Sequence, residues 1–242
     1  MNFKDFKRGL KDGIPIALGY LSVSFGFGIM AVNNGISVLA AVVISLTNLT
    51  SAGQVAGIAV IAAGGTYIEM ALTQLIINLR YALMSLSLSQ KLDKKFTFLS
   101  RLAVSFGITD EIFAVASGKS GEVSKHYMGG LILLPLFGWT LGTFLGSAAG
   151  EILPQRLNAA LGIAIYGMFI AIFVPAVKKS KGVLVVVTIS VALSCCFKYI
   201  PIFKNISQGF SIIICTLIAS VIGAIAFPVR ENNEKAVAYD ES

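Results

Sequence analysis

Eight apolar segments, separated by short polar connections, make up most of this chain. They cover residues 13–33, 36–64, 66–89, 96–117, 127–150, 157–177, 182–197 and 205–227. All but the second approximate the roughly 17–25 residues that a helix needs to cross a bilayer. With 56% hydrophobic and 13% charged residues, a soluble fold would leave more apolar surface than it could bury. The sequence therefore predicts an all-α, polytopic integral membrane bundle of about seven or eight transmembrane segments.

The charge distribution predicts one transmembrane domain over residues 13–228, with a short polar segment at each end. Residues 1–12 are basic, which favours the cytoplasmic side for the N-terminus, and we expect residues 229–242 to form a flexible tail. The net charge of +7 could indicate nucleic-acid binding. However, most basic residues stand between apolar runs, as topology determinants do, so the expected partner surface is the lipid bilayer and not nucleic acid.

The second apolar segment, 36–64, is interrupted by a run of hydroxyl, amide and small side chains at 45–54. Such residues favour a broken helix, because Ser, Thr and Asn compete for backbone hydrogen bonds and Gly tolerates irregular dihedral angles. Irregular backbone survives at membrane depth only when it is buried in protein or lines a cavity. The two halves either cross in succession or form one re-entrant hairpin, and the basic residues do not decide between these topologies.

A broken helix at membrane depth is a candidate binding site, because the N-terminus of a half-helix attracts carboxylates. We therefore expect a binding site at mid-membrane for a ligand that carries a carboxylate, with part of the first helix, 15–26, contributing. The predicted substrate-binding residues are Asn48, Ser51, Gly53, Gln54, Asn78 and Arg80.

Charged residues inside apolar segments mark the second candidate feature, because a charge near the bilayer centre costs roughly 2.5 to 3.5 kcal/mol. Glu69 and Arg80 share a face of the third segment but lie about 16 Å apart along it. Gln74, Asn78 and Tyr81 form a neighbouring polar stripe that should face the protein interior. Arg80 is either a structural anchor that clamps an acidic residue or a ligand for a substrate carboxylate.

Asp110 and Glu111 lie within the fourth segment and point about 100° apart on a helix. One of them is expected to pair with Arg80 while the other faces a cavity. Burial away from water favours the protonated form of a carboxylate, so the group can alternate between a neutral and a charged form. Asp110, Glu111 and Glu69 are therefore candidates for proton coupling or ion pairing. The alternative is a salt bridge between helices without a transport role.

No cluster in the sequence resembles a metal site or a catalytic triad, so neither an enzyme nor a cofactor is expected. The tetrapeptide Val-Ser-Phe-Gly occurs at 23–26 and again at 104–107, which leaves an internal repeat open. The glycine-rich run 138–150 is better explained by close helix packing than by phosphate binding.

Several short motifs together resemble one protein family. They are Gly-Ile-Pro-Ile-Ala-Leu-Gly at 13–19, the polar stretch at 45–54, Asn-Leu-Arg at 78–80, Thr-Asp-Glu-Ile-Phe-Ala at 109–114 and Tyr-Gly-Met-Phe-Ile-Ala at 166–171. In this order they are similar to the AzlC family, the large subunits of bacterial branched-chain amino-acid exporters. The resemblance covers roughly residues 7–175. The chain departs from many relatives at Thr50-Ser51 and Val55, where they have Ala-Gly and Phe, so a site near Gln54 differs in size or polarity.

The resemblance implies a secondary transporter in the bacterial cytoplasmic membrane that exports hydrophobic amino acids such as leucine, isoleucine, valine and methionine. It also implies a small membrane partner of the AzlD type. Coupling to protons is expected from the carboxylates Asp110 and Glu111 of the fourth segment. Two other functions stay open from the residues alone, namely a channel or facilitator for small solutes and a membrane assembly subunit without transport activity. The sequence also leaves a homo-oligomer open.

Overall fold

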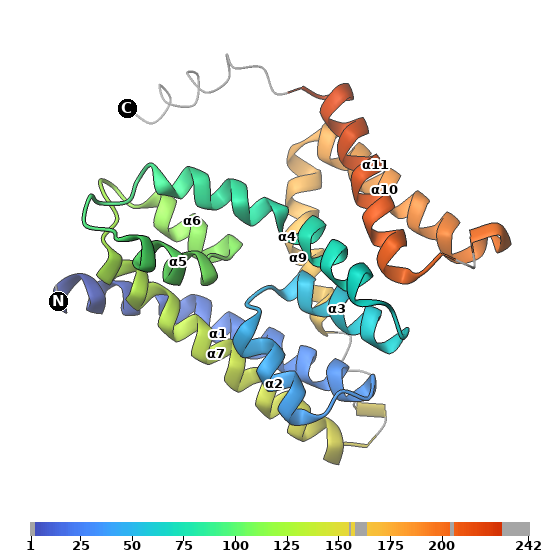
Figure 1. Ribbon diagram of the computed structural model, residues 1–242, viewed down its shortest axis with the longest axis horizontal. Coiled ribbons are helices and arrows are strands. Elements are labelled where there is room, and N and C mark those ends of the chain that lie inside the picture. Colours follow the sequence, from blue (N-terminus) through green and yellow to red (C-terminus); the bar gives the residue numbers. More distant parts are fainter. Residues whose placement is uncertain (1–2, 155, 158–163, 204–205, 229–242) are drawn as a thin grey trace. The chain divides into compact units, whose positions relative to one another are not determined.

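The computed structural model describes residues 3–154, 156–157, 164–203 and 206–228, which form helices and, within these ranges, no strand (Figure 1). The chain divides into two compact units, Met1–Phe169 and Ile170–Ser242. The helical fold predicted from the sequence is confirmed. Residues 229–242 lie outside the described ranges, so the flexibility of the tail stays a prediction.

The first unit is organised around two long parallel helices, α1 (Phe3–Asn33) and α7 (Lys125–Ile152) (Figure 1). α1 includes most of the basic N-terminal segment and, at 31 residues, is about 46 Å long. Glycines on α7 allow the close contact: a Cβ atom at Gly138 would lie 2.5 Å from the Ala17 carbonyl oxygen, and one at Gly146 would collide with the Phe25 carbonyl. The glycine-rich run therefore serves helix packing, as predicted.

The second apolar segment is broken, as predicted, into α2 (Val38–Thr47) and α3 (Ser51–Ala62). The break is locally encoded, because the Thr50 hydroxyl accepts a hydrogen bond from the Gly53 N–H and caps the start of α3. Ile58 of α3 packs in one apolar cluster with Ala41 of α2 and with Phe27 and Met30 of α1. The chain therefore turns back at the break, and residues 38–62 form a helical hairpin, called hairpin 1.

The fourth apolar segment is also broken, although the sequence predicted one continuous span over residues 96–117. It consists of α5 (Phe98–Phe106) and α6 (Asp110–Gly118). α5 ends at Gly107, and the Thr109 hydroxyl caps α6 by accepting a hydrogen bond from the Ile112 N–H. This Gly followed by a Thr cap and acidic residues is a helix stop and start within an apolar run, so apolar length alone was misleading.

The two ends of this second hairpin, called hairpin 2 (residues 98–118), lie together. Leu92, before α5, forms an isolated β-bridge with Val123, after α6. The Lys91 ammonium group donates a hydrogen bond of 2.9 Å to the carbonyl oxygen of Lys119. A cation here also stabilises the negative end of the α6 dipole. Hairpin 2 therefore starts and returns on the same side of the first unit.

Within the first unit, the two hairpins start near opposite ends of α1. The connection that follows hairpin 2 contacts the N-terminal end of α1, through hydrogen bonds from Ser124 to Asp5 (2.7 Å) and from Tyr127 to Asp12 (2.8 Å) (Figure 1). Hairpin 1 instead follows directly on the C-terminal end of α1. α4 (Tyr67–Ser89) runs from hairpin 1 to hairpin 2, so the two hairpin tips approach each other beside it.

The second unit contains most of α9 (Ala164–Lys179) and all of α10 (Lys181–Tyr199), the 3₁₀ turn η1 (Pro201–Phe203) and α11 (Gln208–Ala226). α10 and α11 are antiparallel, because Gly182 faces Phe227 and Gly223 faces Val186. Within the described residues, five helices are long and apolar enough to cross a membrane, namely α1, α4, α7, α10 and α11. The expected seven or eight segments are therefore not confirmed as a count, and two of the predicted segments are hairpins.

Candidate functional site

The two hairpin tips, residues 48–50 and 107–109, meet at a small cavity of about 120 Å³, called the tip cavity. Hairpin 1, hairpin 2 and α4 all contribute to its wall. The Tyr81 hydroxyl of α4 lies 3.4 Å from the Thr50 hydroxyl and thereby joins α4 to the start of α3. The lining residues are Thr47, Asn48, Leu49, Thr50, Asn78, Tyr81, Ser105, Phe106 and Ile108.

The polar stripe on α4 faces hairpin 1, which confirms the predicted orientation. The Gln74 amide donates a hydrogen bond of 2.7 Å to the Gly53 carbonyl oxygen. The Asn78 amide nitrogen donates in turn to the Gln74 amide oxygen at 3.1 Å. This chain of bonds fixes the Asn78 amide and leaves its buried Oδ1 atom without a protein partner. Asn78 therefore offers the tip cavity an unused hydrogen-bond acceptor.

A second cavity of about 270 Å³, called the apolar cavity, adjoins the tip cavity at Thr47 and Asn48, which line both. Its wall is mainly aliphatic, with amide groups at one end. The lining residues are Ile44, Thr47, Asn48, Gly53, Gln54, Gly57, Ile58, Ile61, Met70 and Gln74. The two cavities together therefore present a polar compartment next to an apolar one.

Gln54 closes hairpin 1 on itself and attaches it to α7. Its amide nitrogen donates to the Asn48 carbonyl oxygen, and its amide oxygen accepts a hydrogen bond of 3.1 Å from the Trp139 indole nitrogen. The hydroxyl groups of Ser45 and Thr143 add a second link to α7, at 2.7 Å. Gln54 is 1% exposed. Because its polar atoms are already bonded within the protein, its predicted direct contact with a substrate stays a prediction.

Arg80 forms an ion pair with Asp110, the first residue of α6, with 2.9 Å between Nη1 and Oδ2. Its second terminal nitrogen donates to the Tyr81 hydroxyl at 3.0 Å, and the guanidinium group lies 4.8 Å from the centre of the Tyr81 ring. The side chains of Arg80 and Asp110 are 43% and 37% exposed. Arg80 therefore clamps an acidic residue at the tip of hairpin 2, which is one of the two roles considered for it.

Glu111 contacts α1 and not Arg80. Its Oε2 atom lies 2.5 Å from the Tyr20 hydroxyl, which also lies 2.6 Å from the Thr109 hydroxyl. The Tyr20 ring meets the Trp139 ring edge to face, with 5.2 Å between centroids. Sequence analysis did not single out Tyr20 or Trp139. The available signals were that Tyr20 lies within the implicated part of the first helix and that Trp139 is the single tryptophan in the chain.

The starts of α3 and α6 carry opposite charge patterns. The first turn of α3, which follows Thr50, holds no acidic residue, so its N–H groups and helix dipole present positive potential. The first turn of α6 holds Asp110 and Glu111, which complement the dipole of that helix. The two tips thus differ chemically: one is suited to an anion, and the other supplies carboxylates.

Two other predicted site residues, Ser51 and Glu69, are not among the described residues that line the two cavities. Ser51 is the first residue of α3 and is partly buried. Glu69 is buried near the start of α4, close to Gly65, and lies about 16 Å along the helix from Arg80. The structure therefore does not bring Glu69 to the hairpin tips. Among the described residues, no three potential metal-ligating side chains come together.

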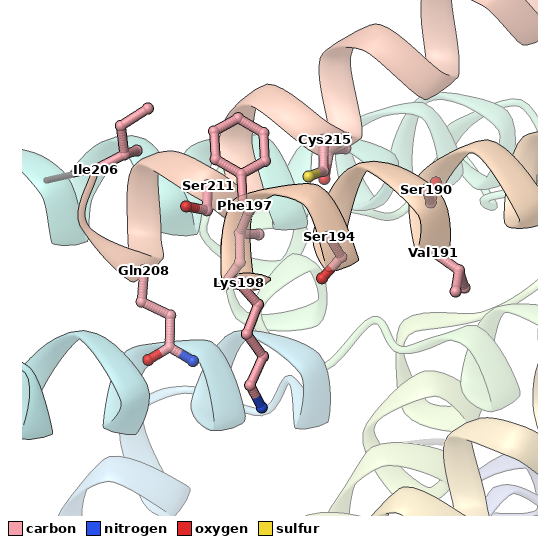
Figure 2. Close-up of a pocket in the computed structure, with 11 residues that line it drawn as sticks. Ser190, Val191, Ser194, Phe197, Lys198, Ile206, Gln208, Ser211 and Cys215 are labelled. Carbon is pink, nitrogen blue, oxygen red and sulfur yellow. The ribbon is translucent and has the colours of Figure 1, made fainter. Parts of the chain in front are cut away.

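A larger groove of about 660 Å³ lies between α10 and α11 in the second unit (Figure 2). Hydroxyl groups from Ser190, Ser194 and Ser211 line it, together with Lys198 and the thiol of Cys215. None of the residues that line this groove is acidic. It therefore lacks the paired positive and negative groups that the hairpin tips of the first unit provide.

Comparison with known proteins shows that both hairpins lie in the part of the chain that a family model matches. The family model described as AzlC protein matches residues 15–153, more than half of the chain. The chain belongs to the AzlC family. The AzlC match includes both hairpin tips and every predicted site residue, but it ends before α9, α10 and α11.

Curated relatives of this AzlC protein are also membrane proteins. The chain is 29% identical over 196 residues to "Inner membrane protein YgaZ" of Escherichia coli (strain K12), covering 78% of this chain and 80% of YgaZ. It is 33% identical over 175 residues to an uncharacterized membrane protein of Archaeoglobus fulgidus, covering 72% of this chain and 76% of that protein. No solved structure matches the chain. This AzlC protein is therefore a membrane protein with a transport-related role.

Proposed function

We propose that this protein is a secondary transporter that exports branched-chain and other hydrophobic amino acids, including leucine, isoleucine, valine and methionine. The observation that carries the proposal is the junction of the tip cavity with the apolar cavity at Thr47 and Asn48. A hydrophobic amino acid has a small zwitterionic head and an aliphatic side chain. These two parts match the polar and the apolar compartment.

The proposed binding mode places the substrate head between the two tips. The first turn of α3, without an acidic residue, binds the carboxylate through backbone N–H groups. The unused Asn78 Oδ1 atom accepts a hydrogen bond from the substrate ammonium group, and the carboxylates at the start of α6 supply negative charge. Arg80 stays paired with Asp110, so it orients the acid and contributes to the carboxylate site through its second guanidinium edge.

The proposed side-chain site is the apolar cavity. Ile44, Ile58, Ile61 and Met70 supply aliphatic contacts there. Burying a leucine-sized side chain contributes roughly 1.5 to 3 kcal/mol, enough to favour it over alanine or glycine. Methionine at position 70 adapts its shape to branched and unbranched chains alike, which fits a transporter for several hydrophobic amino acids.

The opposite orientation of the hairpins supports alternating access. Hairpin 1 is the proposed gate on the side of the C-terminal end of α1, and hairpin 2 the gate on the side of the N-terminal end. Discontinuous helices around a central site recur in secondary transporters, where one structural element moves against another. Glu111 is the proposed proton carrier, and inward proton movement drives outward movement of the amino acid.

The proposed setting is the bacterial cytoplasmic membrane, with the N-terminus in the cytoplasm. A small membrane subunit of the AzlD type is the proposed partner, as the family resemblance implies. In this proposed setting both hairpins are re-entrant. The predicted topology therefore differs from eight successive crossings of the membrane.

The test is transport of labelled leucine in liposomes that contain the purified protein with its partner subunit and an imposed pH gradient. We expect gradient-driven leucine movement that Arg80→Ala and Glu111→Gln strongly reduce while the matched surface variant Lys94→Ala does not. Leucine movement that ignores the gradient would support a facilitator. No leucine movement and no leucine-induced stabilisation of the complex would instead support an assembly subunit.

A further inference from the structure

We propose that Tyr20 and Trp139 are positioning residues that couple the two hairpin tips, so that proton binding at Glu111 changes how Gln54 holds the start of α3. This coupling rests on the proposed function, in which hairpin 1 binds the amino acid and Glu111 carries the proton. It adds two residues that neither contact the proposed substrate nor carry the proton, and it gives them a defined task.

A continuous line of contacts joins the two tips. Glu111 Oε2 lies 2.5 Å from the Tyr20 hydroxyl, the Tyr20 and Trp139 rings meet at 5.2 Å, and the Trp139 indole nitrogen donates to Gln54 at 3.1 Å. The two polar contacts join residues 91 and 85 positions apart in the sequence. Tyr20, Trp139 and Gln54 are all buried, so each is fixed by packing and transmits small displacements.

The Tyr20 hydroxyl is placed to respond to the charge of Glu111. It has a single proton, although the acceptors Glu111 and Thr109 both lie within hydrogen-bond distance. When Glu111 is ionised, the proton points to its carboxylate, because a charged acceptor forms the stronger bond. When Glu111 takes up a proton from water, the new carboxyl O–H donates to Tyr20, and the Tyr20 proton turns to Thr109. Proton binding thus reverses the direction of the bonds at Tyr20.

Trp139 passes this change to hairpin 1. Its ring lies between Tyr20 and Phe27, with 6.5 Å between the Phe27 and Trp139 centroids, so it has little freedom to absorb a movement of Tyr20. Its indole N–H bonds the same Gln54 amide whose nitrogen holds the Asn48 carbonyl at the junction of the two cavities. A shift of Trp139 therefore changes the shape of the proposed binding site.

Other titratable groups near Glu111 must be separated from it in any test. Asp110 is its neighbour on α6 and is paired with Arg80 of α4. Tyr81, also on α4, contacts Arg80, and from α1 the hydroxyl of Tyr20 faces Glu111. The residue that α7 presents to Tyr20 is Trp139, which does not titrate. Asp110 is therefore the main alternative source of a pH response.

The single tryptophan allows a direct experiment, because all intrinsic tryptophan emission reports on Trp139. The full-length protein with its partner subunit is titrated between about pH 4 and about pH 9 without substrate, using a partner from which tryptophan has been removed. We expect a pH-dependent emission shift that Glu111→Gln and Tyr20→Phe abolish and that Asp110→Asn retains. The matched control is Tyr127→Phe, which removes another buried tyrosine–carboxylate bond about 18 Å along α7 from Trp139.

A flat emission profile in the unmodified protein overturns the proposal, as does a full shift in Glu111→Gln or Tyr20→Phe. Leucine addition at constant pH tests the proposed function separately: a pH shift without any leucine response would refute the binding site and leave the coupling intact. If Tyr20→Phe does not fold, Trp139→Phe is tested in liposomes. We expect it to flatten the pH dependence of leucine export, and an unchanged pH profile overturns the proposal.

Discussion

Hairpin 1 and hairpin 2 share a design but differ in chemistry. Each consists of two short helices, and in each a threonine, Thr50 or Thr109, caps the second helix at the tip. Hairpin 1 is held by neutral amides and hydroxyls and starts α3 without an acid. Hairpin 2 starts α6 with Asp110 and Glu111, which contact Arg80 and Tyr20. A similar backbone thus presents one tip whose helix start is free of acids and one tip that supplies carboxylates, and the proposed function uses the first for the substrate and the second for the proton.

The largest effect is expected from a side chain at Gly53 in hairpin 1. A Cβ atom there would lie 2.7 Å from both Gln74 Oε1 and Thr50 Cγ2, so Gly53→Val displaces the Gln74 amide that donates to the Gly53 carbonyl and disturbs the capping Thr50. We expect leucine binding to weaken by about 100-fold or more, which corresponds to about 2.7 kcal/mol. Isothermal titration of the purified complex measures this. The matched control is Gly129→Val on α7, where nothing lies within 4 Å of the added Cβ.

The second prediction concerns the carboxylates of hairpin 2. Glu111→Gln removes the proton-binding group but keeps an acceptor for Tyr20, so leucine affinity should fall much less than gradient-driven export. Gradient-driven export should fall by at least about tenfold, because mutation of a group with a proton-transfer role removes turnover more than binding. Export assays at several pH values check this split. Equal losses of affinity and export would remove the proposed distinction between the two tips.

Matched changes at the two caps should separate stability from function. Thr50→Val and Thr109→Val each remove one capping hydroxyl, so each should lower the free energy of unfolding by about 1 kcal/mol. Their functional effects should differ: Thr50→Val weakens leucine binding by about fivefold, and Thr109→Val alters mainly the pH dependence of export. Thermal unfolding and transport measured on the same preparations compare them. Identical functional defects would contradict the division of roles.

The smallest effect is expected for Arg80→Lys. A lysine keeps the charge next to Asp110 but cannot also donate to Tyr81 in the planar geometry of arginine. Both partners of the pair are more than one third exposed, so the loss of stability should be about 1 kcal/mol or less. A thermal shift measurement would detect it, with Arg101→Lys, at an exposed arginine of α5 in hairpin 2, as the control. A loss of stability much larger than this would show that Arg80 holds the two tips together.

Sequence reasoning found the break in hairpin 1 and missed the break in hairpin 2 for a physical reason. Residues 45–54 are polar at six of their ten positions, so the break is visible in composition. Residues 96–117 are apolar enough to resemble a continuous span, and the break there depends on one glycine and one capping threonine. The polar stripe on α4 was predictable from helical spacing, because residues three or four positions apart share a face.

The sequence by itself determined the membrane-type helices, the break near Asn48, the polar stripe and the choice of charged residues. These features depend on hydropathy, helix periodicity and capping, which act over a few neighbouring residues. Only the tertiary structure showed that residues 98–118 form two helices folded into a hairpin, that the two tips meet, and that Tyr20 and Trp139 lie between the tips. Those contacts join residues 85 to 91 positions apart, and packing of α1 against α7 brings them together. No local pattern encodes such a distance, so the site existed in the sequence as separate parts and became one site by folding.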